Sequence, residues 1–445
     1  MNREQWSSKL GFIMASAGAA IGLGAIWKFP YVAGMNGGAA FFLIFILFTV
    51  LIGLPMLISE FVIGRGAKKE AITAYKTLAP NSKWKIVGQF GVLGSFLLLS
   101  FYSVVGGWVL IYTFLSITGQ VIGEGANYPD LFGSITASPF ITLTGLATFL
   151  LINVMVISLG IKNGIEKASK YMMPLLFIFF IVLVVRSLTL EGAMEGVSFF
   201  LKPNFSSITA GGVLYALGQS FFALAVGFSC MVTYSSYLGK EVSIPNAASS
   251  VVLMNIFVSL LAGLAIFPAV FAFGLEPTEG PGLLFVILPT VFAEIPLGGL
   301  FLSLFMLLFL FATLTSSFSL LEIIVSAFTE NKERSRKRVS WVSGSIMFIA
   351  GIPAALSMST LSNFTIFGKT VFDATDYLVS NIMLPLGSFL IAMFIVYRMD
   401  KSLVEKEFKL ATSKSIDWYS AWVFLMKWVV PITILIVYIN MLGIW

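Results

Sequence analysis

The sequence predicts an all-α polytopic membrane protein of eleven helices, in which the first and sixth helices are broken halfway across the membrane. Three observations support this class. Of the 445 residues, 58% are hydrophobic and only 11% are charged, whereas soluble domains carry about 25% charged residues. Several uncharged runs exceed the ~20 residues that a membrane-spanning helix needs. Two of these runs carry glycine clusters at mid-length.

Eleven apolar segments are long enough to cross a bilayer. They cover residues 9–31, 38–63, 86–118, 138–159, 170–190, 209–238, 244–274, 290–328, 338–357, 370–397 and 419–443. With the N-terminus in the cytoplasm, most of the 27 Lys and Arg residues fall on cytoplasmic segments, as the positive-inside rule requires. An odd number of spans then places Trp445 outside. Because the net charge of +6 follows this topology, the partner that it indicates is the lipid bilayer and not nucleic acid.

The first span contains Gly18, Gly22 and Gly24, each of which weakens a helix by roughly 1 kcal/mol relative to alanine. Counted from Lys9 at ~1.5 Å per residue, these glycines lie about 14–23 Å deep in a hydrocarbon core of ~30 Å. Backbone freed by a break at that depth persists only where it faces protein or a wet cavity. Such a break offers carbonyl groups to a cation and N–H groups to an anion. Close helix packing through small residues is the alternative.

The sixth span repeats this feature between Gly218 and Gly227, with residues 223–227 at mid-membrane depth. Interrupted helices at corresponding positions of two five-span halves indicate a transporter site. The halves cover residues 9–190 and 209–397, and because five is odd, the second half is inverted. Residues 419–443 add an eleventh helix to a single transporter domain that covers residues 1–445.

Polar residues in the other spans suggest ligands and gates. Thr315 and Ser316 offer the hard oxygens that sodium prefers, although such hydroxyls often bond back to the preceding turn. Glu60 and Glu322 are further charges within spans, and such charges are candidates for function. The absence of histidine and the presence of a single cysteine, Cys230, exclude an internal disulfide, Ser-His and Cys-His catalysis, and most zinc sites.

Several ordered motifs together resemble the neurotransmitter:sodium symporter family over nearly the whole chain. They are Gly22-Leu-Gly24, Trp27-Lys-Phe-Pro-Tyr31, Asn36-Gly-Gly38, Gly53-Leu-Pro55 with Glu60 and Gly64-Arg65, Phe101-Tyr102 with Trp108, Gly218-Gln219-Ser-Phe-Phe222, and Leu314-Thr-Ser-Ser317. The resemblance implies the LeuT-type 5+5 inverted repeat. Eleven spans and a short N-terminus are typical of a bacterial member in the plasma membrane, and this chain is most similar to members that carry several hydrophobic amino acids.

The resemblance also implies two sodium sites. The second would use carbonyl groups of Gly18, Ile21 and Ala312 and hydroxyl groups of Thr315 and Ser316. The first would use the carbonyl groups of Ala20 and Ala223, the Asn255 side chain and the substrate carboxylate. The chain departs from the family pattern at Ala25 and Ala223, where two side-chain ligands are missing. Because Phe45, Ala223 and Ser259 complete neither a chloride shell nor its substituting glutamate, we expect no requirement for chloride.

For the substrate, the resemblance implies an amino acid whose carboxylate meets the N–H groups of Leu23 and Gly24 and the Tyr102 hydroxyl. Its ammonium would meet the carbonyl groups of Ala20 and Phe222. The side chain would be surrounded by Leu98, Phe222, Ala225, Phe228, Ser316, Ser319 and Leu320. Gly22 stands where amine-carrying members have an aspartate, so the site requires a negative group from the substrate itself.

The same resemblance assigns gates. Lys28 and Asp376 would pair outside the site, and Tyr102 with Phe228 would form a lid. Arg3 and Glu330, with Trp6 and Tyr237 beside them, would form a cytoplasmic latch, and Gly164 and Pro174 match a Gly-X9-Pro motif that lets the fifth helix unwind. We therefore predict sodium-coupled symport of neutral hydrophobic or aromatic L-amino acids by alternating access, and no enzyme activity. The alternatives are proton coupling through Glu60 or Asp376, and an ion channel, which would need a continuous polar pore.

Overall fold

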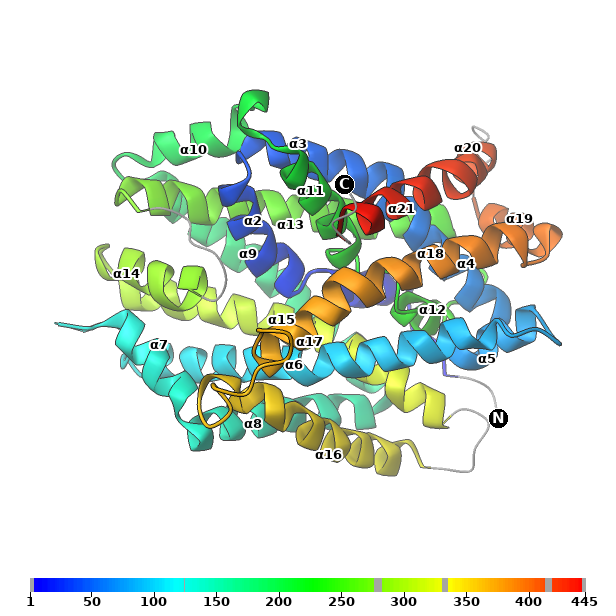
Figure 1. Ribbon diagram of the computed structural model, residues 1–445, viewed down its shortest axis with the longest axis horizontal. Coiled ribbons are helices and arrows are strands. Elements are labelled where there is room, and N and C mark those ends of the chain that lie inside the picture. The colour runs from blue at the N-terminus through cyan, green and yellow to red at the C-terminus, as the bar shows by residue number, and fades with distance from the viewer. Residues whose placement is uncertain (1–3, 124, 276–281, 330–334, 413–417, 442–445) are drawn as a thin grey trace.

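The computed structural model describes residues 4–123, 125–275, 282–329, 335–412 and 418–441. Within these ranges the regular elements are helices, and the only β pairing is an isolated bridge between Ile366 and Lys369. The long helices run roughly side by side along the longest axis of the molecule, with α7, α10 and α14 at one end and α5 and α19 at the other (Figure 1).

The helices that form the first half of the chain follow the predicted order, with α5 and α7 in connections. They are α1 (Lys9–Ala20), α2 (Phe29–Met35), α3 (Ala39–Phe48), α4 (Leu54–Ala67), α5 (Ala71–Leu78), α6 (Lys85–Ile117), α7 (Tyr128–Ala137), α8 (Pro139–Ser158) and α9 (Lys167–Leu188). Short π-helical segments at Gly24–Lys28, Thr49–Gly53 and Ile161–Glu166 precede α2, α4 and α9.

The second half begins with the connecting helix α10 (Ala193–Leu201) and a 3-10 turn at Phe205–Ser207. It continues with α11 (Ala210–Phe222), α12 (Cys230–Ser235), α13 (Ile244–Ala272), α14 (Leu288–Ala293), α15 (Gly298–Thr329), α16 (Arg336–Ala355), α17 (Val371–Tyr377), α18 (Leu384–Tyr397), α19 (Lys401–Lys409), α20 (Trp418–Phe424) and α21 (Val430–Met441). Further π-helical segments occupy Leu283–Ile287, Leu378–Met383 and Leu425–Val429, and a 3-10 turn occupies Leu356–Met358.

Helix lengths in the described ranges agree with the predicted spans. Nine continuous helical segments are long and apolar enough to cross a membrane, and α1 with the Gly24–Met35 segment forms a tenth that is bent by 52° at its break. The remaining predicted span, the sixth, is divided into α11 and α12, each shorter than a span. Both breaks that the glycines predict are therefore present.

Two boundaries differ clearly from the prediction. The fifth span was expected to begin at residue 170, but the helical segment begins at Ile161, because Lys162, Glu166 and Lys167 interrupt the apolar run without ending the helix. The eighth span was expected to begin near residue 290, but α15 begins at Gly298 because residues 283–293 form a separate helical segment. Pro296 and Leu297, whose φ of 61° is left-handed, separate the two. Apolar composition continues across this turn, so hydropathy alone joins the two segments.

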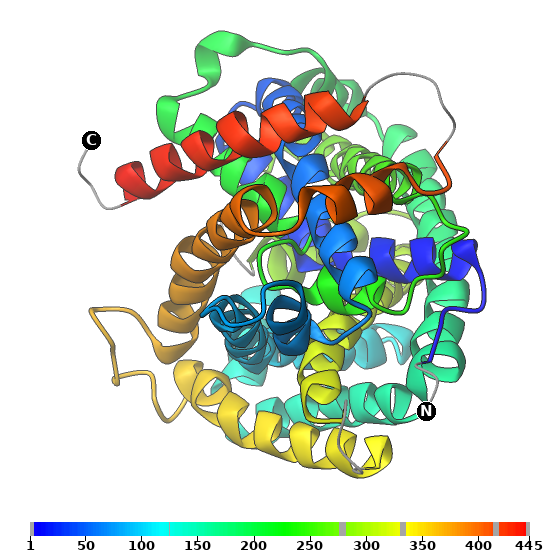
Figure 2. The same cartoon turned by 90° about the vertical axis from the view of Figure 1, so that its right-hand side faces the viewer.

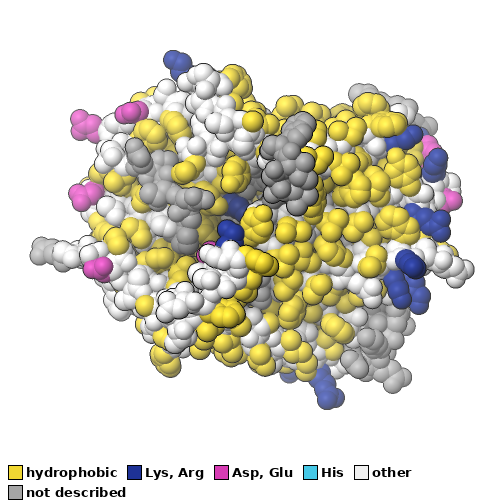
Figure 3. Space-filling view, viewed as in Figure 1, with side chains coloured by type: hydrophobic (Ala, Val, Ile, Leu, Met, Phe, Trp, Pro, Cys, Tyr) yellow, Lys and Arg dark blue, Asp and Glu magenta, His cyan; other side chains and the backbone are white. Residues whose placement is uncertain are grey.

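The surface and the packing fit a membrane bundle. Hydrophobic side chains cover the middle of the face shown in Figure 3, whereas most Lys and Arg side chains visible there lie toward the end that carries α5 and α19. The interior is built on α6, which packs along α15, while α1 contacts α9, α13 and α15. From the α5 end, α16 and the C-terminal helices α20 and α21 lie at the periphery (Figure 2).

Candidate functional site

The break in the first span leaves its backbone close to α15. α1 begins at Lys9 and ends at Ala20, and the hydroxyl of the N-terminal capping residue Ser8 accepts a hydrogen bond from Gly11 N (3.0 Å). A β-carbon added at Gly22 would lie 2.2 Å from Ser316 Oγ and 2.8 Å from the Tyr102 hydroxyl oxygen. No side chain fits there. The glycine therefore allows two polar side chains to reach the broken backbone.

The break in the sixth span is strained and is held by a buried carboxylate. Ala225 and Ser229 have left-handed φ values of 51° and 59° between α11 and α12. Glu60, fully buried on α4, accepts hydrogen bonds from the N–H groups of Gly227 (2.7 Å), Met231 (3.1 Å) and Val232 (3.3 Å). The first turn of a helix has N–H groups without helical partners, and Glu60 supplies partners for those at the start of α12.

A small cavity lies between the two breaks. The structure brings all eleven residues predicted to bind substrate to its wall. They are Ala20, Leu23, Gly24, Leu98, Tyr102, Phe222, Ala225, Phe228, Ser316, Ser319 and Leu320. Ala19, Gly22, Cys230 and Leu384 complete the wall. Most of these side chains are apolar, whereas the polar groups are at the broken backbone, Tyr102 and the α15 hydroxyls.

The residues proposed for the second sodium site lie where α1 meets α15. Ser316 Oγ donates to the carbonyl oxygens of Gly18 (2.9 Å) and Ala19 (3.0 Å). Thr315 Oγ1 lies within 2.9 Å of the Phe311 carbonyl and 3.2 Å of the Ala312 carbonyl in its own helix, and a β-carbon at Gly18 would touch it at 3.2 Å. Carbonyl and hydroxyl oxygens thus converge from both helices, which is the donor set that a hard cation takes.

The first sodium site is supported by an unsatisfied side chain. Asn255 Nδ2 lies 2.7 Å from the Ala223 carbonyl oxygen and 3.5 Å from that of Ala20. Its Oδ1 is buried without a hydrogen-bond partner among the described residues. Rotating the amide by 180° would place Oδ1 beside the same two carbonyl oxygens, and the two orientations differ little in shape. Three oxygens can therefore face one point, which fits a cation despite the missing side chains at Ala25 and Ala223.

On the side of the cavity nearer α17, the predicted gate residues share a second cavity but are not paired. Lys28 and Asp376 both line it, together with Phe101 and Phe372. Lys28 Nζ lies 4.9 Å from the centre of the Phe222 ring, and Asp376 Oδ1 accepts a hydrogen bond from Ser380 (2.7 Å). Among the described residues, no ion pair within 4.0 Å joins Lys28 to Asp376.

On the opposite side, Arg3 and Glu330 lie outside the described residues, so their predicted latch stays a prediction. Their predicted neighbours do meet. Trp6 Nε1 donates to the Tyr234 carbonyl (2.9 Å), its backbone N–H donates to the Tyr237 carbonyl (3.3 Å), and the Trp6 and Tyr237 rings meet edge to face.

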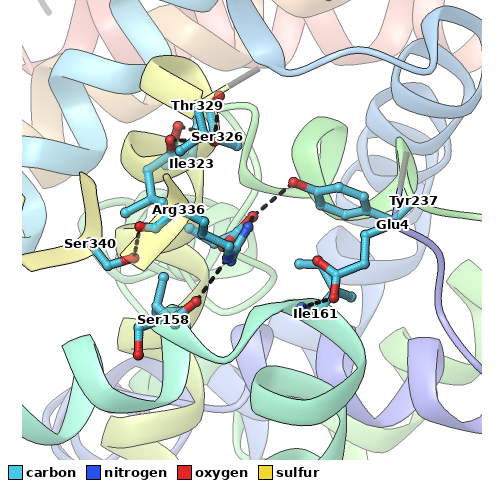
Figure 4. Close-up of polar contacts among 12 residues, drawn as sticks. Glu4, Ser158, Ile161, Tyr237, Ile323, Ser326, Thr329, Arg336 and Ser340 are labelled. Atoms are coloured by element: carbon cyan, nitrogen blue, oxygen red, sulfur yellow. Dashed lines mark hydrogen bonds and ion pairs between the residues drawn. The ribbon is translucent and has the colours of Figure 1, made fainter. Parts of the chain in front are cut away.

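A buried ion pair that the sequence analysis did not identify continues this contact. Tyr237 donates its hydroxyl to Glu322 Oε1 (2.8 Å), and both carboxylate oxygens of Glu322 accept from the guanidinium of Arg336 (Figure 4). Arg336 Nε also donates to the Ile157 carbonyl (2.8 Å). The sequence indicates Glu322 only as a charge within a span and gives no signal that it pairs with Arg336. The network therefore joins α8, α15 and α16 to the residues that follow α12.

The start of the fifth span holds the N-terminal segment through a second carboxylate. Glu166 accepts from Ser7 N (2.8 Å) and pairs with Lys170 Nζ (2.7 Å), while Glu4 Oε1 accepts from Ile161 N (3.0 Å). Gly164 lies in the π-helical segment Ile161–Glu166, and Pro174 lies inside α9. The segment between these two motif residues is helical in this structure, and its unwinding stays a prediction.

Comparison with known proteins agrees with this geometry. The model of the "Sodium:neurotransmitter symporter family" matches residues 3–127 and 133–443. An uncharacterized sodium-dependent transporter of Bacillus subtilis (strain 168), YhdH, is 52% identical over 441 residues, covering 99% of this chain and 98% of that protein. An uncharacterized sodium-dependent transporter of Haemophilus influenzae is 39% identical, with 98% of each chain covered.

Among solved structures, MhsT in complex with L-phenylalanine superposes with a TM-score of 0.92 at 42% identity, covering 98% of this chain and 99% of that one. The predicted similarity to MhsT and the LeuT-type fold are therefore confirmed, as is the expectation that the protein is a membrane transporter and not an enzyme. The chain belongs to the sodium:neurotransmitter symporter family.

Proposed function

We propose that this protein is a sodium-coupled symporter that carries neutral hydrophobic or aromatic L-amino acids into a bacterial cell. The observation that carries the proposal is the cavity between the two breaks, where broken backbone and an apolar wall face the same space. MhsT, in which L-phenylalanine is bound, supports an amino acid as the substrate.

The charges of the cavity wall favour an amino acid over an amine. Gly22 places no carboxylate at the break, so an amine without its own carboxylate would have no counter-charge and would leave N–H groups unpaired. The N–H groups of Leu23 and Gly24 and the Tyr102 hydroxyl would take the substrate carboxylate. The carbonyl groups of Ala20 and Phe222 would take its ammonium.

The rest of the wall fits the substrate side chain. Leu98, Phe228 and Leu320 offer apolar contacts, and the small Ala225 leaves room for an aromatic group. Burying such a side chain gains ~25 cal/mol per Å² of apolar surface. We therefore expect leucine, phenylalanine and tryptophan to bind more tightly than alanine or serine.

Two sodium ions would be held, the second by Gly18, Ile21, Ala312, Thr315 and Ser316, and the first by Ala20, Ala223, Asn255 and the substrate carboxylate. Bound sodium supplies the positive charge that links α1 to α15, and its inward gradient supplies the driving force. Chloride is not required in this proposal, because Phe45 and Ala223 supply no anion donor.

Alternating access would use the contacts on the two sides of the cavity. Closure of the Tyr102–Phe228 lid and approach of Lys28 to Asp376 would seal the outer side. Release of Trp6, Tyr237 and the Arg3–Glu330 pair, aided by unwinding of the helix between Gly164 and Pro174, would then open the cytoplasmic side. The N-terminus would lie in the cytoplasm and the C-terminus outside.

The test is uptake of radiolabelled leucine and tryptophan into proteoliposomes under an inward gradient of sodium or of protons. We expect uptake with sodium alone, and its loss in the double variant Thr315→Ala/Ser316→Ala. Thr313→Ala is the matched control, because Thr313 Oγ1 bonds only within its own helix (Leu310 carbonyl, 2.9 Å). Uptake driven by a proton gradient alone would favour the proton-coupled alternative, and equal competition by tryptamine and tryptophan would contradict the amino-acid proposal.

A further inference from the structure

One wall of the substrate cavity comes from a helix that carries none of the predicted binding residues. Leu384, the first residue of α18, lines the cavity and is 3% exposed. Cys230, the first residue of α12, also lines the cavity, and its thiol lies 3.4 Å from Ser95 Oγ. The side chain of Leu384 offers only apolar atoms, so it suits the side chain of a substrate and not its charged groups.

The position of Leu384 is fixed by a close backbone contact between α18 and the sixth-span break. Gly227 has a φ of 107°, and a β-carbon there would lie 2.7 Å from the Leu384 carbonyl oxygen and 2.6 Å from Ser388 Oγ. A β-carbon at Gly387 would lie 2.0 Å from the Gly227 carbonyl oxygen. Because the two backbones already touch, α18 cannot move closer to the break to fill space, nor can the break move toward α18.

The same span carries the outer gate. α17, the π-helical segment Leu378–Met383 and α18 follow one another without interruption, and Asp376 on α17 lines the outer cavity. Asp376 and Leu384 are eight residues apart, which is about 12 Å along a helix. A substrate side chain that presses on Leu384 therefore presses on the helix that also bears Asp376.

We infer that Leu384 is a specificity-determining residue, which sets the length of the apolar side chain that the cavity accepts. Contact between this side chain and Leu384 also sets the position of the helix that bears the outer gate residue Asp376. A side chain that reaches Leu384 packs against it, a shorter one leaves a gap, and a longer one displaces α18 together with Asp376. This inference rests on the proposed amino-acid substrate.

The test measures ligand protection against unfolding. Protection of purified full-length protein against thermal unfolding would be measured with sodium and increasing alanine, leucine or tryptophan. Each titration gives an apparent affinity without requiring transport.

The variants are Leu384→Ala and Leu384→Phe, with Leu386→Ala as the matched control, because Leu386 is a half-buried leucine of the same helix that does not line the cavity. Loss of the contacts of a few methylene groups changes the ratio of affinities for two substrates by about tenfold or more. We expect Leu384→Ala to weaken leucine protection about tenfold while tryptophan protection is kept, and Leu384→Phe to weaken tryptophan protection while alanine protection is kept. Leu384→Val should shift the leucine-to-tryptophan ratio in the same direction as Leu384→Ala, by less, and serves if the alanine variant does not fold.

Two failures are distinguishable. A wild-type protein that no amino acid protects against thermal unfolding would overturn the proposed function and this inference with it. Protection of the wild type, with the same leucine-to-tryptophan ratio in the Leu384 variants as in Leu386→Ala, would overturn this inference alone.

Discussion

Replacing Glu60 by glutamine should disrupt the sixth-span break without changing the size of the side chain. The carboxylate of Glu60 accepts three backbone hydrogen bonds at 2.7–3.3 Å. An ionised carboxylate can accept at both oxygens, whereas an amide can accept only at one. In Glu60→Gln the amide oxygen can face either the Gly227 N–H or the N–H groups of Met231 and Val232, so at least one of the three N–H groups would face an NH₂ group.

The magnitude follows from the lost contact. A buried donor left without a partner costs about 1–3 kcal/mol, so Glu60→Gln should destabilise the folded protein by about 1–3 kcal/mol. The control is Ser59→Ala, one residue away and equally buried. Its hydroxyl bonds only to the Pro55 carbonyl in the same helix (2.8 Å), so its loss should cost about 1 kcal/mol or less.

The assay is thermal unfolding of detergent-purified protein by fluorescence-detected gel filtration, followed by sodium-dependent binding of leucine. We expect a clearly lower melting temperature and weaker binding for Glu60→Gln, and values near wild type for Ser59→Ala. If Glu60→Gln melted together with Ser59→Ala, the two carboxyl oxygens would not both be needed as acceptors at the sixth-span break, and the reasoning would be refuted.

Three further predictions concern the cavity and the side of it that holds Trp6 and Tyr237. Gly22→Ala should abolish substrate binding, because its β-carbon would lie 2.2 Å from Ser316 Oγ, whereas Gly218→Ala, with no atom within 4 Å, should bind normally; equal binding would contradict the packing argument. Ala225→Gly should relieve the strain of the left-handed φ of 51°, about 1–2 kcal/mol in the folded protein. The greater conformational entropy of glycine in the unfolded chain offsets ~0.4–1 kcal/mol of this gain. We therefore expect a small rise in melting temperature, whereas a fall would show that this φ is not strained. Glu322→Gln should leave Arg336 without its carboxylate and weaken this network by about 3–5 kcal/mol. Amide hydrogen exchange in residues 4–8 should therefore be faster than in the control Ser340→Ala, whose hydroxyl bonds to the Arg336 carbonyl of its own helix. Equal exchange rates in the two variants would argue against a gate at the Glu322–Arg336 pair.

The sequence by itself determined the membrane class, the spans and the two breaks. These properties are local: hydropathy over about 20 residues identifies a span, and Gly18, Gly22 and Gly24 weaken a helix wherever they stand. The motifs around Trp27, Gln219 and Thr315 added the family and most of the cavity wall. The separate helix at residues 283–293 was missed because the turn at Leu297 lies within continuous apolar sequence.

Only the tertiary structure decided which distant side chains meet. The Glu322–Arg336 pair, the three N–H groups on Glu60 and the separation of Lys28 from Asp376 depend on how helices pack and on side-chain geometry, which no local pattern encodes. Leu384 illustrates the limit most directly. In the sequence it is one leucine among many in an apolar helix, and it reaches the cavity because Gly227 and Gly387 let two backbones touch.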